Sequence, residues 1–466
     1  MTEALMARVV QSAQEFLGSL EDGPVGSRAT AEELRSRLAA PLGDEPQDPL
    51  DVIDGLIEGV QSGLTLMGSG RFFGFVLGGT LPAALAADWL TSAWDQNAGL
   101  FAPSPAACVV EDAVGDWLKS LLGLPPSASF ALVTGGQMAN FTALAAARHH
   151  VLAEVGWDVE RRGLAGAPRI RVVAGAKRHA TIDRALRYLG LGTDCIEAVE
   201  VDDQGRILAD ALERALVDAH EPIIVCAQAG EVNTGAFDDL TAVCDVAHGA
   251  RAWVHVDGAF GLWAATSPRH RRLVAGVEGA DSCTTDCHKW LNVPFDCGVA
   301  LCAHPASHRA AMTVQAEYLV QSEAGGPRDP VDWNPEFSRR ARGFTVYAAL
   351  RSLGRSGVAD LVERSCDRAT QFAQRLGAVP GVEVLNDVVL NQVLVRFTRL
   401  GASAADNDAF TRSVVAQVQD SGVCWMSGTT WRGQAAMRIS VCSWRTTEDD
   451  VDRSVAAILD AAGDRS

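Results

Sequence analysis

The sequence predicts an α/β protein with a large, mostly parallel sheet covered by helices on both faces, followed by a smaller α+β domain. Between about residues 70 and 345, short apolar runs alternate with segments of helical periodicity, a pattern typical of parallel sheets. Beyond residue 345 the pattern changes to one long helix and several alternating runs. The 466 residues are also too many for a single compact core.

Six runs in the first region are predicted strands, because each is short and apolar. Predicted helices separate several of them. The strands are Phe130–Thr134, Ile170–Ala174, Ile223–Gln228, Ala252–Asp257, Ser282–Thr285 and Gly298–Cys302, and the helices are Asn140–Leu152, Ala180–Leu189 and Leu208–Ala219.

The chain is expected to divide into an N-terminal helical segment (1–95), a large α/β domain (96–345) and a small α+β domain (346–466). A change in hydrophobic periodicity marks the second boundary. In the small domain the predicted elements are a helix over Thr345–Leu376, strands at Val382–Leu385, Asn391–Phe397 and Met437–Val441, and a final helix from Glu448.

Charge and cysteine usage exclude several classes of function. A net charge of −18 and a pI near 5.0 argue against a nucleic-acid or anionic-membrane surface. No stretch has the ~18 unbroken apolar residues of a membrane span, and the N-terminus does not resemble a secretory signal. The eleven cysteines are scattered without metal or redox spacing. We therefore expect a reduced, cytoplasmic protein without a metal site.

Lysine is scarce in this chain, and its scarcity narrows the search for a reactive amine. The three lysines are Lys119, Lys177 and Lys289. Lys119 falls in a predicted helix and is expected to face solvent. Lys289 precedes Trp290 and Leu291, and a lysine in such a setting loses its proton readily and acts as a nucleophile.

Four polar features follow predicted strands, and each has a structural alternative. Gly135-Gly136 opens a helix and suits an anion, although a tight turn would use the same residues. His179 and Asp257 each follow a strand, where open α/β sheets bind ligands. Taken alone, a histidine at such a position is more often a capping or surface residue. For Asp257 a helix cap or a structural ion pair is an equal alternative. The fourth feature is Lys289, for which the alternative is a surface lysine.

Together these features match what pyridoxal phosphate (PLP) requires of a protein. The phosphate needs an anion-binding turn, the ring needs a stacking partner and an acid at its nitrogen, and the aldehyde needs an amine. Small residues beside Asp257, such as Ala259, leave space for a flat ring. The sequence therefore predicts a PLP enzyme with its cofactor on Lys289.

The sequence also resembles the group II pyridoxal-dependent decarboxylases, which include the aromatic-amino-acid and glutamate decarboxylases of PLP fold type I. The resemblance covers most of the chain from about residue 50. It implies a seven-stranded type of sheet and a homodimer with the site at the subunit interface. The matching stretches are Arg71–Phe75, Pro103–Ala106, Gly135-Gly136 with Ala139-Asn140, His255–Gly261, His288–Leu291, Phe295–Gly298, Ser338–Arg342 and Leu353–Arg355.

The resemblance assigns roles to individual residues. Lys289 would form the Schiff base, Asp257 would pair with the pyridine nitrogen, and His179 and Ala259 would lie on the two faces of the ring. Arg438 matches an arginine that binds the substrate carboxylate in some relatives, although an exposed strand arginine is an equal alternative. Gly135, Gly136, Gln137 and His288 would hold the phosphate, and Phe75, Val76 and Asn97 would line the substrate pocket.

Two departures from the family pattern bear on the reaction. Where relatives often carry Gly-Thr-Thr, this chain has the stretch Gly230–Gly235 (GEVNTG), so a hydroxyl near the cofactor is replaced. Pro330 stands where many relatives carry the loop tyrosine that protonates the carbanion, and the lid loop would cover Ser322–Pro330. His179 or a water would then be the proton donor.

The leading hypothesis is therefore decarboxylation of a small-molecule L-amino acid to carbon dioxide and an amine. Loss of the tyrosine opens an alternative, in which oxygen captures the carbanion and an aldehyde forms. An aminotransferase, a carbon–carbon lyase and a catalytically idle PLP-binding protein are the remaining alternatives. The substrate's identity stays open, because Phe72, Phe73, Phe75 and Trp94 suit either a pocket or core packing, and Gly78 and Gly99 could widen the site.

Overall fold

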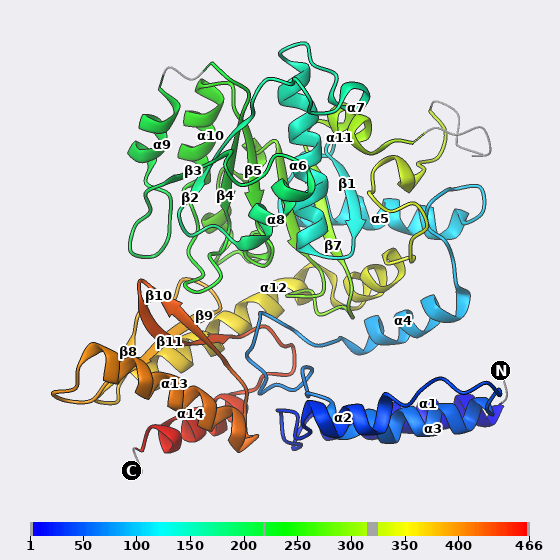
Figure 1. The fold of residues 1–466 in the computed structure, drawn as a ribbon, viewed down its shortest axis with the longest axis vertical. Helices are drawn as coiled ribbons and strands as arrows, with labels where there is room; N and C mark the ends of the chain where they lie inside the picture. Colours follow the sequence, from blue (N-terminus) through cyan, green and yellow to red (C-terminus); the bar gives the residue numbers. More distant parts are fainter. Residues whose placement is uncertain (1–2, 218–219, 315–324, 464–466) are drawn as a thin grey trace.

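The computed structural model describes residues 3–217, 220–314 and 325–463, and its centre is a seven-stranded sheet (Figure 1). The strand order is β1-β7-β6-β5-β4-β2-β3, and β7 alone runs antiparallel to its neighbours. The predicted fold class, a mostly parallel sheet of this type, is thus confirmed. The strands are β1 (Ser129–Val133), β2 (Arg171–Gly175), β3 (Ile196–Val199), β4 (Ile223–Gln228), β5 (Trp253–Asp257), β6 (Ser282–Asp286) and β7 (Gly298–Cys302).

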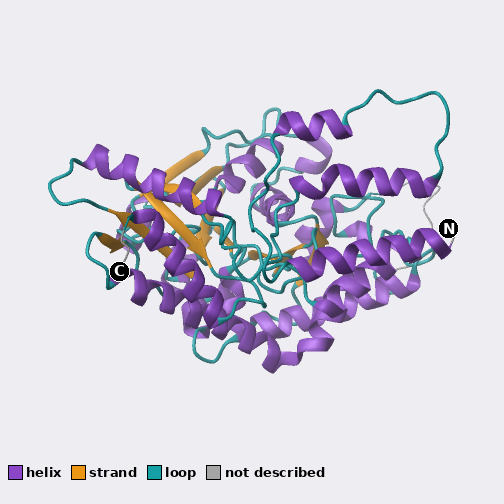
Figure 2. Ribbon diagram, turned by 90° about the horizontal axis from the view of Figure 1, so that it is seen from below, coloured by secondary structure: helices purple, strands orange, loops and turns teal. Residues whose placement is uncertain are grey.

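Helices cover both faces of this sheet, because successive side chains of a strand point to opposite faces. Val172 and Ile224 pack into one core, whereas their neighbours Val173 and Val225 pack into another. Figure 2 shows the helices surrounding the strands. One face carries α6 (Gly136–Ala153), α7 (Val159–Arg162), α8 (Ala180–Tyr188) and α11 (Pro305–Met312), and the other carries α5 (Pro105–Leu122), α9 (Ala209–Leu216) and α10 (Leu240–Gly249).

A second, antiparallel sheet of four strands forms the small domain, in the order β10-β11-β9-β8. The long helix α12 (Gly343–Gly377) lies between the two sheets (Figure 1) and is interrupted at Gly354, whose φ is 61°. This matches the predicted α+β character. The remaining elements are β8 (Val382–Val384), β9 (Gln392–Phe397), α13 (Ala404–Ser421), β10 (Ser427–Trp431), β11 (Gln434–Ser440) and α14 (Glu448–Ala462).

The N-terminal helices lie along one side of the molecule (Figure 1). They are α1 (Glu3–Ser19), α2 (Ala31–Leu38), α3 (Pro49–Val60) and α4 (Pro82–Trp94). The first three pack mainly on one another. No residue of α1 or α2 is buried, and in α3 only Gly59 is.

Short 3-10 helices connect several of these elements. They are η1 (Gln61–Gly63), η2 (Gly261–Thr266), η3 (Arg271–Val274), η4 (Val277–Gly279) and η5 (Pro330–Asp332). Across the described ranges, no helix combines the length and the apolar character needed to cross a membrane.

Candidate active site

One cavity of about 370 Å³ brings together side chains from both sheets. Asp257 ends β5, Lys289 follows β6, and Arg438 comes from β11 of the small domain. The position agrees with the rule that ligands of open α/β sheets bind at the carboxyl ends of the strands. Of the residues predicted from the sequence, Phe75, Val76, His179, Asp257, Ala259, Lys289 and Arg438 line the cavity; Gln228, Gly230, Val232, Phe260, Ser427 and Gly428 complete it.

Asp257 is a buried carboxylate, with only 6% of its surface exposed. Its Oδ2 accepts a hydrogen bond from Asn140 Nδ2 at 3.1 Å, and its Oδ1 accepts one from the Ala259 amide at 3.2 Å. Both carboxylate oxygens therefore already accept an N–H group, and the carboxylate still lines the cavity, where it can accept a further hydrogen bond.

Lys289 supplies the only lysine amine that lines the cavity among the described residues. Its Nζ lies 3.0 Å from Oδ2 of Asp286, the last residue of β6. Asp286 is buried, and its Oδ1 has no hydrogen-bond partner. The ion pair holds the amine between the cavity and the start of α6.

His288 lies beside the same carboxylate, on the side away from the cavity. Its Nδ1 accepts a hydrogen bond from the Cys297 amide at 3.1 Å, which places the proton of the neutral ring on Nε2. Nε2 is 3.6 Å from Asp286 Oδ1. Burial lowers the pKa of His288, while the Asp286 carboxylate opposes that shift.

Gly135 and Gly136 start α6 and do not line the cavity themselves. They pack against the Asp286–His288 pair that lies behind Lys289. A Cβ at residue 136 would lie 2.9 Å from Asp286 Oδ2, and one at residue 135 would lie 3.0 Å from His288 Cε1. Only glycine permits this approach, and the helix start offers free N–H groups to an anion.

Gln137 and His179 complete the set that the sequence indicated. The Gln137 amide has a buried oxygen without a partner, and its nitrogen donates weakly to the Thr181 carbonyl at 3.4 Å. His179 caps α8, with Nδ1 at 2.8 Å from Thr181 Oγ1. An amine, a carboxylate, a histidine and an unsatisfied amide near a helix start are the donors and acceptors that PLP requires, so the residues present fit this cofactor.

The wall of the cavity contains two consecutive residues in the left-handed region. Phe75 has a φ of 55° and Val76 a φ of 59°, which is costly for a β-branched residue. The preceding segment is tied to the small domain: the Phe73 amide donates to the Trp425 carbonyl at 2.8 Å, and the Ser440 amide donates to the Phe73 carbonyl at 2.9 Å. The strained wall is thus imposed by packing on the small domain.

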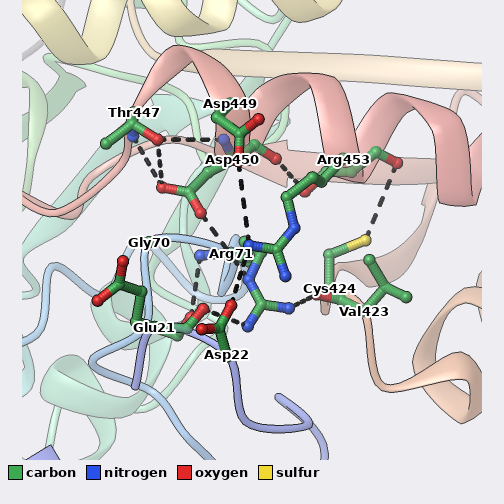
Figure 3. A network of polar contacts seen from close by, with 12 residues as sticks. Glu21, Asp22, Gly70, Arg71, Val423, Cys424, Thr447, Asp449, Asp450 and Arg453 are labelled. Atoms are coloured by element: carbon green, nitrogen blue, oxygen red, sulfur yellow. Dashed lines mark hydrogen bonds and ion pairs between the residues drawn. The ribbon is translucent and has the colours of Figure 1, made fainter. Parts of the chain in front are cut away.

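Arg71, at the start of this segment, lies in a network of polar contacts (Figure 3). Its guanidinium is buried and donates to the carbonyls of Glu21, at 2.8 Å, and Gly23, at 3.0 Å, and also to that of Val423. Asp450 of α14 lies 3.8 Å from its Nε. One side chain thereby joins the N-terminal segment, the cavity wall and the small domain.

Arg438 is buried rather than exposed, which rejects the alternative of a surface strand arginine. It retains 9% exposure, its Nη1 reaches the Val232 carbonyl only at 3.5 Å, and its Nε has no partner. Burial lowers its pKa, and the nearby Glu231 carboxylate partly restores it. An under-paired buried cation in a cavity is suited to bind an anion.

Asn97 and Pro330 also lie outside the cavity. Asn97 is exposed, and its Oδ1 accepts a hydrogen bond from the Arg339 amide at 3.0 Å. Pro330 is buried at the start of η5, where the next amide, that of Val331, donates to the Gly99 carbonyl at 2.9 Å. Residues 322–324 of the expected lid lie outside the described residues.

Packing decides one open alternative and corrects three expectations. Phe72 and Phe73 are core residues, with 1% and 0% exposure. Lys119 was expected to face solvent, but it is 7% exposed because its Nζ donates to the Pro126 carbonyl at 2.8 Å. Gly78 does not widen the site: a Cβ there would lie 2.5 Å from the Lys289 carbonyl, so the glycine allows close packing over the lysine loop. Gly99 likewise packs against the Phe337 carbonyl.

Sequence reasoning assigned no role to Asn140, Thr181 or Asp286, which contact the predicted residues directly. Asp286 could have been found, because it ends a buried strand as Asp257 does. The departure from the family pattern at Glu231 has a local explanation. The Glu231 carboxylate accepts hydrogen bonds from the amides of Asn233 and Thr234, at 2.7 and 2.8 Å. Val232, and not Glu231, lines the cavity.

Comparison with known proteins decides the family. The family model for the pyridoxal-dependent decarboxylase conserved domain matches residues 32–398. The chain belongs to this family. It is 27% identical over 444 residues to an aromatic-L-amino-acid decarboxylase from Bacillus atrophaeus (94% of this chain, 90% of the relative), and 25% identical over 462 residues to a phenylacetaldehyde synthase from Arabidopsis thaliana (96% and 93%).

A solved structure agrees with both fold and family. The crystal structure of Oryza sativa TDC with PLP and tryptamine is 26% identical, with a TM-score of 0.92 over 99% of this chain and 97% of that chain. The predictions of a PLP cofactor and of an amino-acid decarboxylase, a carboxy-lyase, are therefore confirmed. The family supports the decarboxylase as the main interpretation, and the relatives of this chain include an aldehyde synthase.

Proposed function

We propose that this decarboxylase acts on an L-amino acid with an apolar, aromatic-sized side chain. The observation that carries the proposal is the single cavity that joins an amine, a buried carboxylate, a histidine and an under-paired arginine. The side chains that form its apolar part are Phe75, Val76, Val232 and Phe260. In the described part of the chain, Arg438 is the only arginine lining the cavity, which suits one substrate carboxylate rather than two.

Each of the chain's own residues then has a task. PLP, when bound, accepts the electrons that remain on Cα after carbon dioxide leaves. Lys289 would hold the cofactor covalently through its amine, and Asp286 orients that amine beforehand at 3.0 Å. Asp257 would bind the protonated ring nitrogen with a carboxylate that already accepts two N–H groups.

The remaining side chains position the cofactor and the substrate. His179 and Ala259 would lie on the two faces of the ring, and Arg438 would bind the substrate α-carboxylate. The phosphate would lie at the start of α6, where a helix offers free N–H groups and positive potential; its residues are Gly135, Gly136, Gln137 and the neighbouring His288.

His179 is the proposed proton donor to Cα. Its Nδ1 accepts from the Thr181 amide at 3.3 Å, so the proton of the neutral ring is on Nε2, where it can serve the cavity. Pro330 cannot donate a proton. The alternative outcome is formation of an aldehyde, with oxygen and water consumed and ammonia and peroxide released. A relative from Arabidopsis thaliana is named as an aldehyde synthase.

A homodimer in a reducing, cytoplasmic compartment is part of the proposal. Large apolar side chains are exposed on the helices next to the cavity wall, and a second copy of the chain would cover them. They are Val52 and Leu56 of α3, Trp89, Leu90 and Trp94 of α4, and Val109 of α5. Asn97, which lies outside its own cavity, would reach the substrate pocket of the second copy. All eleven cysteines are buried and free, as a reducing compartment allows.

Reductive trapping tests the central residue. Borohydride treatment of the protein with PLP should fix the cofactor on the peptide that contains Lys289, and Lys289→Ala should remove this label. Absence of label on that peptide in the wild type would overturn the proposal. Release of carbon dioxide should be faster from aromatic amino acids than from glutamate or 2,4-diaminobutyrate. Parallel assays of amine, aldehyde and peroxide separate protonation from oxidation.

A further inference from the structure

A chain of hydrogen bonds between buried side chains leads from Trp253, at the start of β5, to Asp257, at its end. Trp253 Nε1 donates to Ser282 Oγ at 2.9 Å, and Ser282 Oγ lies 2.9 Å from His255 Nδ1. His255 Nε2 lies 3.0 Å from Asn140 Oδ1, and Asn140 Nδ2 donates to Asp257 Oδ2 at 3.1 Å. All five side chains are at most 6% exposed.

The chemistry of these groups fixes one direction for the chain. The Trp253 indole can only donate, so Ser282 accepts from it and has its own proton free for His255 Nδ1. The neutral His255 ring then carries its proton on Nε2 and donates it to Asn140 Oδ1. Burial lowers the pKa of His255 to about 4, which keeps the ring neutral near pH 7.

Hydrogen bonds running in the opposite direction would leave a mismatch at Asp257. A proton on Nδ1 of His255 would leave the lone pair of Nε2 facing Asn140, and the Asn140 amide would have to rotate to satisfy it. Rotation would place the amide oxygen against the Asp257 carboxylate, where two acceptors repel each other. The observed orientation is therefore the one that satisfies every member of the chain.

Asn140 also has a second N–H, which leads to the other side of the cavity. Its Nδ2 donates to Thr181 Oγ1 at 3.1 Å, and that hydroxyl lies 2.8 Å from His179 Nδ1. Because the Thr181 hydroxyl accepts from Asn140, its own proton is available to His179 Nδ1. One amide therefore orients groups at both Asp257 and His179.

We infer that Asn140 is a positioning residue for both Asp257 and His179. Trp253, Ser282 and His255 fix the direction of its amide, together with the Thr284 hydroxyl, which donates to Asn140 Oδ1 at 2.9 Å. The chain holds Asp257 as a hydrogen-bond acceptor for the ring nitrogen and holds His179 with its proton on Nε2. This inference rests on the proposed function, because it assigns how the two groups named there are kept in their working states.

Trp253, the first member of this hydrogen-bond chain, is held in place by its neighbours. The Trp253 ring packs against the rings of His150 and His304, with centroids 5.0 and 4.9 Å away, and these two histidine rings also contact each other at 4.7 Å. His304 Nε2 is 2.7 Å from Asp281 Oδ1, and Asp281 Oδ2 accepts from the Val254 amide at 2.6 Å. The indole therefore cannot turn its N–H away from Ser282 without disturbing this cluster.

Three variants test the inference. Asn140→Asp keeps the shape but removes both donors and places an acceptor against Asp257. Ser282→Ala removes the proton that fixes the His255 ring. Thr142→Val is the matched control, because Thr142 is equally buried on α6 and its hydroxyl bonds only within that helix, to the Met138 carbonyl at 2.8 Å.

Two measurements on the full chain, besides activity, report the positioning. The Kd for PLP should rise at least tenfold in Asn140→Asp, rise about threefold in Ser282→Ala, and stay within twofold in Thr142→Val. Nitrogen-15 NMR of labelled histidines, without PLP, should show the Nε2–H form of His255 in the wild type and a change of that form in Ser282→Ala.

The outcomes separate this inference from the proposed function. If PLP still labels Lys289 but Asn140→Asp and Ser282→Ala match the control in both measurements, the positioning role is wrong and the proposed function stands. If the wild type itself is not labelled at Lys289, the proposed function fails. Should Asn140→Asp not fold, Ser282→Ala decides the matter through the histidine spectrum and the Kd.

Discussion

Replacing Arg438 by methionine is expected to stabilise the protein while removing most of its activity. The guanidinium is 9% exposed, its Nε has no partner, and its closest acceptor is the Val232 carbonyl at 3.5 Å. A buried charge with such poor pairing costs free energy, and an apolar side chain of similar size often stabilises by about 1–4 kcal/mol. We expect a gain of about 1–2 kcal/mol in the free energy of unfolding.

The loss of activity follows from the same side chain. Charge-assisted hydrogen bonds contribute about 1.5–3 kcal/mol each. Arg438→Met would lose two such hydrogen bonds to the substrate carboxylate. After the cost of desolvating the arginine is subtracted, kcat/KM should fall by about 100-fold. Urea denaturation of the cofactor-free chain measures the stability, and release of carbon dioxide measures kcat/KM.

Arg396 on the neighbouring strand β9 offers a matched control. It is equally buried, but its Nη1 lies 2.8 Å from Asp408 Oδ1 and it is not part of the cavity. Arg396→Met should destabilise by about 1–2 kcal/mol and leave kcat/KM nearly unchanged. Our reasoning is refuted if Arg438→Met destabilises as much as Arg396→Met, or if it leaves kcat/KM at the wild-type value.

Three further perturbations test the architecture around the site. Arg71→Met leaves three carbonyls without their donor and should lower the free energy of unfolding by at least about 3 kcal/mol in thermal or urea unfolding. Arg453→Met removes only exposed ion pairs and should lower it by less than about 1 kcal/mol. Equal effects would refute the anchoring role. Leu56→Glu, at a side chain 51% exposed, should dissociate the proposed dimer in analytical ultracentrifugation, whereas Leu400→Glu, at a fully exposed position, should not. A Leu56→Glu variant that dimerises as strongly as the wild type would refute this surface as the proposed interface. Burial lowers the pKa of His308 from 6.5 to about 4, so the unfolded chain binds its proton first and stability is lost as the pH falls from about 6.5 towards 4. At pH 5 the loss in the free energy of unfolding is about 2 kcal/mol. In His308→Gln the free energies of unfolding measured in urea at pH 7 and pH 5 should therefore differ by about 2 kcal/mol less than in the wild type. An unchanged difference would show that His308 does not cause the loss.

Several elements of the fold escaped prediction for identifiable reasons. Strand β3 has exposed residues in its centre, and β10 alternates buried and exposed polar residues, so neither shows an apolar run. Helix α13 begins with the polar sequence Ala404–Asp408 and ends at Ser421, and four of its residues are buried. Each is stabilised by neighbours in space rather than by its own periodicity.

The sequence by itself determined the features that are local in the chain. Lys289 follows one buried strand and Asp257 ends another, and both facts can be read from an apolar run and the polar residue after it. The order of the strands placed both residues at the same edge of the sheet. The family and its cofactor followed from these local motifs.

Only the tertiary structure decided which groups complete the site. Asn140 and Asp257 are 117 residues apart and meet through a single hydrogen bond. Lys119 turns inward because the Pro126 carbonyl accepts a hydrogen bond from its Nζ. Asn97 lies outside the cavity, where its side-chain oxygen accepts a hydrogen bond from the Arg339 amide and its backbone pairs with Arg340. Such pairings depend on distances across the fold, and hydrophobic periodicity records burial but not the partner that a buried polar group finds.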